Sequence, residues 1–144
     1  MKVVIALGSN LGDRKGTLDE AVEELRKIIT ITKVSSYIET DPVGGPEQPD
    51  YLNAVLIGES ELSPTDLLST MQEIELAAGR ERIERWGART LDLDLIVYGD
   101  LVMETEFLTL PHPRAHERRF VLDPWLEVEP GAYLPGFGEV GLLP

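Results

Sequence analysis

The sequence contains no cysteine, few aromatic residues and no long hydrophobic run. The lack of cysteine excludes a disulfide framework and a thiolate metal site, and it is compatible with a reducing compartment. The apolar run at the N-terminus ends at Gly8, which makes it too short for a signal peptide or a membrane-spanning helix. We therefore expect a cytoplasmic protein without a membrane partner.

Positive charge is also scarce, because 13 Lys and Arg residues face 26 Asp and Glu residues, for a net charge of −13. Such a charge repels nucleic acid and anionic lipid, so we expect neither as a partner. Seven arginines nevertheless gather in two short stretches: Arg80, Arg82, Arg85 and Arg89, and Arg114, Arg118 and Arg119. Guanidinium groups suit phosphate oxygens. The stretches indicate either a site for a compact polyphosphate or solvated loops paired with neighbouring glutamates.

What remains is an ordinary globular composition, with 144 residues of which 42% are hydrophobic and 27% charged. This size and composition favour one folded domain over residues 1–144, which we expect to act as a monomer.

Hydrophobic periodicity predicts four strands and two helices. The strands are expected at 2–7, 31–40, 51–58 and 91–98, and the helices at 13–29 and 63–79. The order βαββαβ is typical of a ferredoxin-like α+β fold, an antiparallel sheet with its helices packed on one face. A short C-terminal extension follows, with a strand-like piece at 101–110 and a helical piece at 115–122.

Two carboxylates stand out on the last predicted strand of the sheet. Asp92 and Asp94 alternate with leucines, so both should point to the same face. Paired carboxylates suit Mg²⁺, which completes its coordination with water and substrate phosphates. A bare Asp-x-Asp pattern is more often a solvated edge strand, so the pair alone does not decide, and the metal interpretation gains support from the arginines at 80–89 directly before it.

Residues 85–95, Arg-Trp-Gly-Ala-Arg-Thr-Leu-Asp-Leu-Asp-Leu, are similar to the signature of the 6-hydroxymethyl-7,8-dihydropterin pyrophosphokinases, and only Ala88 departs from it. Further stretches match in order at 8–12, 48–53, 111–114 and 117–122. Several matches in register over most of the chain are far more specific than one short motif. The sequence therefore resembles this family of kinases, the ATP-dependent transferases of folate biosynthesis.

The resemblance implies transfer of pyrophosphate from ATP to the hydroxymethyl group of 6-hydroxymethyl-7,8-dihydropterin, with release of AMP. It implies two Mg²⁺ ions held by Asp92 and Asp94. The catalytic residues would be Arg80, Arg82, Arg89 and Asp94. The ATP-binding residues would be Gln72, Glu75, Arg89, Leu95, Thr109, His112 and Arg118. The pterin-binding residues would be Thr40, Val43, Tyr51, Asn53, Asp92 and Phe120, with Trp86 closing over the substrates as a lid.

Two other functions remain compatible with the residues. Another two-metal nucleotidyl or phosphoryl transferase would use the same aspartates, but it has no need of an aromatic clamp for a pterin. A non-catalytic ferredoxin-like ligand-binding module would share the fold and would bind without consuming ATP.

Overall fold

The computed structural model describes residues 1–41, 50–79 and 91–144. The main sheet contains β1 (Lys2–Ser9), β2 (Thr30–Val34), β3 (Ile38–Thr40), β4 (Tyr51–Glu59) and β5 (Asp92–Tyr98). The described residues form the α-helices α1 (Arg14–Arg26), α2 (Pro64–Gly79) and α3 (Arg119–Val128). The smaller elements are β6 (Met103–Glu104), β7 (Thr109–Leu110), β8 (Tyr133–Leu134) and β9 (Gly138–Glu139), with 3-10 helices η1 (Ala115–Glu117) and η2 (Val140–Leu142).

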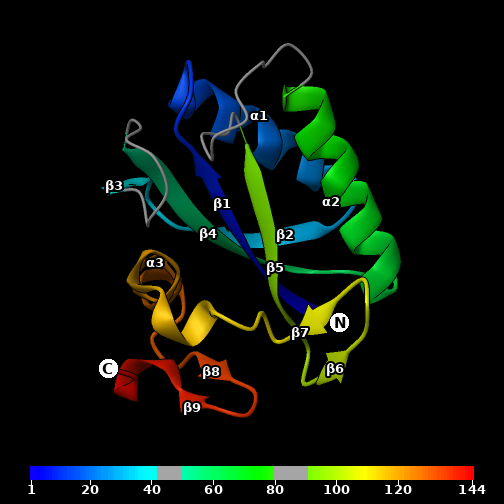
Figure 1. Cartoon of the computed structure of the whole chain (residues 1–144), viewed down its shortest axis with the longest axis vertical. Helices are drawn as coiled ribbons and strands as arrows, with labels where there is room; N and C mark the ends of the chain where they lie inside the picture. Colours follow the sequence, from blue (N-terminus) through cyan, green and yellow to red (C-terminus); the bar gives the residue numbers. More distant parts are fainter. Residues whose placement is uncertain (42–49, 80–90) are drawn as a thin grey trace.

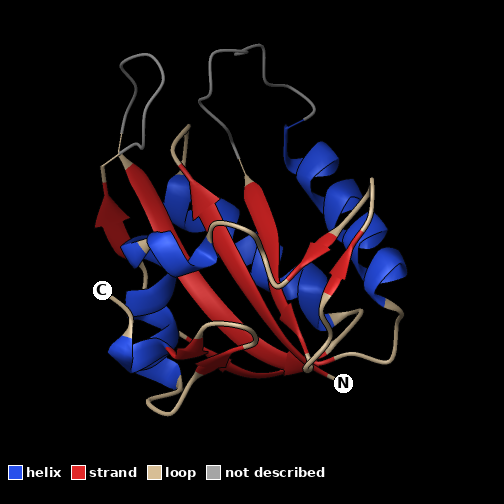
Figure 2. Ribbon diagram, turned by 60° about the horizontal axis from the view of Figure 1, so that its bottom comes forward, coloured by secondary structure: helices blue, strands red, loops and turns tan. Residues whose placement is uncertain are grey.

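The main sheet is antiparallel, with the strand order β2-β4-β1-β5, and β3 extends the pairing of β4 (Figure 1). This confirms the predicted α+β class and the antiparallel sheet. The small pairs β6–β7 and β8–β9 form separate hairpins (Figure 2). Among the described residues, no helix combines the length and the hydropathy needed to cross a membrane.

Local sequence signals explain where the first two helices begin. The Asp13 carboxylate accepts a hydrogen bond of 3.0 Å from the Gly16 N–H at the start of α1. At the start of α2, the Ser63 hydroxyl accepts one of 3.2 Å from the Asp66 N–H. Both side chains satisfy donors that the first helical turn leaves unpaired. The predicted helix to residue 29 is three residues too long, because α1 ends at Arg26.

Each face of the sheet has its own hydrophobic core. Helices α1 and α2 cover one face, where Ile5, Leu7 and Leu56 are buried. The other face packs Val4 and Val55 beneath α3 and the C-terminal residues (Figure 1). The prediction of helices on one face was therefore incomplete, because the C-terminal extension supplies the cover of the second face.

Two predicted strands are interrupted. The stretch 31–40 divides into β2 and β3 at Ser35, whose hydroxyl accepts the Val55 N–H at 2.9 Å and so replaces a strand-to-strand bond. The stretch 101–110 folds back as the β6–β7 hairpin, with the Thr105 hydroxyl accepting the Leu108 N–H at 3.1 Å in the turn. The predicted helix at 115–122 divides into η1 and a longer α3. Side-chain hydrogen bonds of this kind compete with the regular backbone pattern.

Candidate active site

The two aspartates lie side by side on β5, as their spacing predicts. Asp94 is paired with Ala6 of β1 and Asp92 with Gly8, and both carboxylates are half-buried. Leu93 points to the opposite face and is buried beneath α1 and α2. The carboxylates therefore face the side of the sheet that carries α3.

A cavity of about 210 Å³ lies on that side. It brings together residues that are far apart in the sequence and that come from β1, β3, β4, β5, the segment leading into α3 and the first turn of α3. Its lining consists of Ala6, Leu7, Gly8, Thr40, Asp41, Tyr51, Asn53, Asp92, Asp94, Arg114, Arg118 and Phe120. Seven residues named from the resemblance are in this lining: Thr40, Tyr51, Asn53, Asp92, Asp94, Arg118 and Phe120.

A glycine makes room for two of these side chains. A Cβ atom on Gly8 would lie 2.8 Å from Asn53 Oδ1 and 3.3 Å from Tyr51 Cδ2. Asn53 is 5% exposed, and its amide nitrogen donates a hydrogen bond to the Thr40 hydroxyl. The missing side chain on β1 thus lets the Asn53 amide and the Tyr51 ring lie against the backbone of the neighbouring strand.

The opposite wall of the cavity belongs to the start of α3. The Arg118 guanidinium lies 5.5 Å from the centre of the Phe120 ring, within the range of a cation–π interaction. This contact holds an aromatic face and a positive charge together on the wall that faces the aspartates.

His112 lies close to Asp94, with 3.8 Å between His112 Nε2 and Asp94 Oδ1. The Arg114 N–H donates to His112 Nδ1 at 3.2 Å, which leaves the other ring nitrogen toward the carboxylate. Burial lowers the pKa of His112, and the positive charges of Arg118 and Arg114 lower it further. The lowered pKa favours the neutral ring at pH 7, and because Nδ1 accepts from the Arg114 N–H, the proton of that ring belongs on Nε2.

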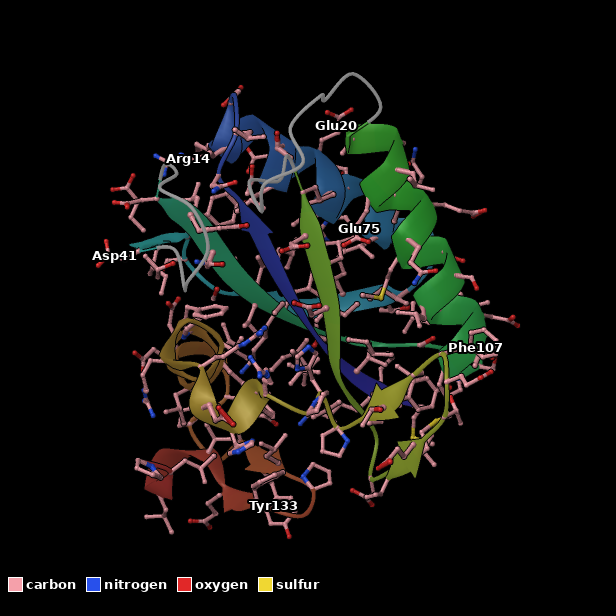
Figure 3. All side chains as sticks on the ribbon, in the orientation of Figure 1. Arg14, Glu20, Asp41, Glu75, Phe107 and Tyr133 are labelled. Carbon is pink, nitrogen blue, oxygen red and sulfur yellow. The ribbon has the colours of Figure 1, made fainter. Side chains whose placement is uncertain are left out.

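Four other described residues that were named for ATP do not line the cavity: Gln72, Glu75, Leu95 and Thr109. Glu75 points from α2 toward β5 (Figure 3), and its carboxylate accepts the Leu93 N–H at 2.7 Å. Gln72 is exposed on α2, and Thr109 is half-buried on β7. The Leu95 side chain lies in the core and is 3% exposed. The backbone of Leu95 pairs with Ile5 of β1.

Residues 4–130 match the family described as 7,8-dihydro-6-hydroxymethylpterin-pyrophosphokinase (HPPK). The chain belongs to the HPPK family. The pyrophosphokinase of Bacillus subtilis is 48% identical over 126 residues, which cover 86% of this chain and 75% of that protein. The pyrophosphokinase of Haemophilus influenzae is 43% identical over 133 residues, which cover 91% and 83%. Both carry the name 2-amino-4-hydroxy-6-hydroxymethyldihydropteridine pyrophosphokinase.

The fold is also similar to that of Plasmodium falciparum HPPK-DHPS, with a TM-score of 0.75 at 13% identity. That likeness covers 99% of this chain and 40% of the Plasmodium chain, so this chain spans less than half of that protein. At such low identity the likeness concerns the fold alone.

Several residues that the HPPK resemblance names lie outside the described residues: Val43, Arg80, Arg82, Trp86 and Arg89. Their roles in pterin binding, catalysis and closure over the substrates stay predictions.

Five lining residues are not among the site residues that the resemblance implies: Ala6, Leu7, Gly8, Asp41 and Arg114. Gly8 and Arg114 lie inside stretches that match the HPPK family, so those motifs offered a signal. Arg14 does not line the cavity, but its guanidinium donates to the Asp50 carbonyl at 3.0 Å and to the Glu39 carboxylate at 2.6 Å. Its side chain thus links the start of α1 to β3 and to the residue before β4. No local sequence pattern indicates a contact over such separations.

Proposed function

We propose that the protein transfers the β,γ-diphosphoryl group of ATP to the hydroxymethyl group of 6-hydroxymethyl-7,8-dihydropterin and releases AMP. The observation that carries the proposal is the cavity in which Asp92 and Asp94 lie beside Tyr51, Asn53 and Phe120. It joins a polar, aromatic-walled space with the carboxylates that a magnesium-bound nucleotide requires. Membership of the HPPK family supports the same reaction.

The donor set fits magnesium that arrives with a nucleotide. Among residues 1–41, 50–79 and 91–144, no group of three or more His, Cys, Asp or Glu side chains gathers into a metal site. Two carboxylates suit a Mg²⁺ ion that takes its other ligands from water and phosphates. Asp92 and Asp94 would hold two such ions, and bound Mg²⁺ would neutralise the phosphate charge and lower the pKa of the attacking hydroxyl.

The chain itself contributes mainly position and charge. Tyr51 and Phe120 offer aromatic surfaces to the flat pterin ring, and the buried Asn53 amide offers hydrogen bonds to its edge. Arg118 and the neutral His112 offer N–H donors to phosphate oxygens beside Asp94. Holding both substrates in line in this way lowers the barrier without a covalent intermediate.

The ferredoxin-like description of the fold belongs to the same proposal. The strand order β2-β4-β1-β5 is fully antiparallel, and α1 and α2 follow β1 and β4 in the chain. Both helices cover one face, as the split βαβ arrangement requires.

The test is to incubate the protein with Mg-ATP, with and without the pterin, and to separate the nucleotides. AMP should appear only when the pterin is present, in amounts equal to the diphosphorylated pterin. ADP as the product would indicate a different phosphoryl transferase. Binding of the pterin without any consumption of ATP would instead support a non-catalytic module.

A further inference from the structure

A second cavity, of about 370 Å³, adjoins the candidate active site. It is lined by Thr40, Arg114, Glu117, Arg118, Arg119 and Phe120. Four of these residues also line the cavity that contains Asp92 and Asp94: Thr40, Arg114, Arg118 and Phe120. The two spaces therefore meet at a wall that carries two guanidinium groups.

The three arginines of the second cavity differ in what already engages them. Arg119 forms an ion pair with Asp123 and donates to the carbonyls of Leu143 and Pro144 at 3.4 and 3.5 Å. Arg118 lies over the Phe120 ring. Arg114 has no ion pair within the part of the chain that the structure describes.

The backbone of Arg114 is firmly placed although its side chain is exposed. Its N–H donates to His112 Nδ1 at 3.2 Å, and its carbonyl accepts the Glu117 N–H at 3.0 Å. The His112 N–H in turn donates to the Ile96 carbonyl of β5 at 2.9 Å. The base of the side chain is thus fixed to the strand of the two aspartates, while the charged end remains available to a ligand. Its charge is felt at His112, where it lowers the pKa of the ring.

We infer that Arg114 is a further substrate-binding residue, whose guanidinium binds the diphosphoryl group on the pterin side of the reaction. The inference rests on the proposed function. In that reaction the hydroxymethyl oxygen forms a bond to the β-phosphorus, and the bond from this phosphorus to the α,β-bridging oxygen breaks. The bridging oxygen leaves with AMP, and the hydroxyl proton passes to solvent. Negative charge therefore moves from the nucleotide toward the pterin cavity, where Arg114 faces it.

A comparison of two ligands, the uncharged pterin and its diphosphorylated product, distinguishes a role of Arg114 in phosphate binding from a structural role. Arg114 should contribute to binding of the product and little to binding of the pterin, because only the product carries phosphate oxygens. A charge-assisted hydrogen bond to phosphate is strong enough to change a dissociation constant by about tenfold. A loss of pocket shape would instead weaken both ligands together.

The experiment compares Arg114→Gln with the matched variant Arg119→Gln, which removes an arginine of the same cavity that Asp123 already engages. Calorimetric titration with 6-hydroxymethyl-7,8-dihydropterin and with its diphosphate, together with AMP release, is measured for the full chain. We expect R114Q to bind the diphosphate about tenfold more weakly and the pterin within twofold of the unmodified protein. R119Q should bind both ligands as the unmodified protein does.

Three outcomes would overturn the inference. Unchanged diphosphate binding in R114Q, with AMP release by the unmodified protein intact, would remove Arg114 from the site and leave the proposed function standing. Equal weakening of both ligands would assign Arg114 a structural role. Absence of AMP release by the unmodified protein would refute the proposed function itself, and the role of Arg114 with it. Arg114→Lys, which keeps the charge, should recover part of the diphosphate affinity.

Discussion

The two faces of the main sheet are built from alternate residues of the same strands, yet they differ in what covers them. On the face of α1 and α2, hydrophobic side chains of β1, β4 and β5 pack against both helices in one core. On the face of α3, Val4, Val55 and Trp125 form a core at one end, whereas Gly8, Asn53 and the aspartates surround a cavity at the other. The period of two in each strand lets one face supply stability while half of the other supplies chemistry.

The largest effect that would test this division concerns Asp94. Asp94→Asn keeps the shape of the side chain but removes a charge that the proposed magnesium site needs, so kcat should fall on the order of a thousandfold. The melting temperature should stay nearly unchanged, because the group is half-buried beside a cavity. AMP release and thermal unfolding are the measurements. Asp123→Asn, on α3 and paired with Arg119, is the control and should keep full activity. An Asp94→Asn protein with a tenth or more of the activity would contradict the role.

The second largest effect is expected from a cavity made in the core beneath α1 and α2. Leu56 is fully buried in β4 beneath α1 and α2, and Leu56→Ala should lower the free energy of unfolding by about 3 kcal/mol. Activity should persist at temperatures well below unfolding, because this side chain points away from the active site. Urea denaturation measures the loss, with the exposed Val102→Ala as a control expected to change little. A loss below about 1 kcal/mol would mean that stability does not reside chiefly on this face.

Gly8→Ala would disturb the cavity on the α3 side of the sheet and leave the hydrophobic core beneath α1 and α2 unchanged. The added methyl group would lie 2.8 Å from Asn53 Oδ1, so the amide must move. We expect KM for the pterin to rise about tenfold, with a smaller change in KM for ATP. Steady-state kinetics with each substrate varied in turn distinguish the two. Gly131→Ala, where nothing lies within 4 Å of an added Cβ, should behave as the unmodified protein. Equal changes in both KM values would argue against a specific effect on the pterin pocket.

A smaller kinetic effect is expected for Arg14, which touches the site only through other residues. Arg14→Gln breaks the link from α1 to Glu39 and Asp50, so Thr40 and Tyr51 beside them should be held less firmly. KM for the pterin should rise about threefold, with kcat little changed. Lys15→Gln is the control, because Lys15 pairs with Asp19 on its own helix. A variant with unaltered pterin KM would assign Arg14 to stability alone.

The smallest effect concerns the polar attachment of α3 to the sheet. Hydrogen bonds from the Ser36 hydroxyl and N–H lower the pKa of Glu127. The folded state therefore binds a proton at Glu127 less readily than the unfolded state does. The stabilisation is fully present above the pKa of Glu127 in the unfolded state, and it is lost as pH falls through the lower pKa of the folded state.

Glu127→Gln should accordingly lower stability by less than about 1 kcal/mol at pH 7, because the group is largely exposed. The difference from the unmodified protein should shrink as pH falls, because protonation of Glu127 removes the charge that the Ser36 hydrogen bonds stabilise. Thermal unfolding at pH 7 and near pH 3 measures it, with the exposed Glu106→Gln as the comparison. A difference that grows at acid pH would contradict the assigned cause.

Much of the fold could be predicted because its signals are local. Asp13 and Ser63 mark the starts of α1 and α2, and the alternation of leucines with Asp92 and Asp94 gave the correct face for the first residues of β5, from Asp92 to Leu95. The division of 31–40 at Ser35 could not be predicted, because it depends on a hydrogen bond to Val55 of another strand. The cover of the second face by α3 was missed for a similar reason, since a short apolar segment does not reveal what it packs against.

For the site, the sequence by itself determined which residue types were present and which motifs carried them. Asp92, Asp94, Tyr51, Asn53 and Phe120 were all named before any contact was known. Only the tertiary structure decided that they share one cavity, that Gly8 makes room for Asn53, and that Arg114 lies where two cavities meet. The physical reason is that periodicity and capping act over a few residues, whereas a cavity forms where strands and helices distant in the chain leave a space between them.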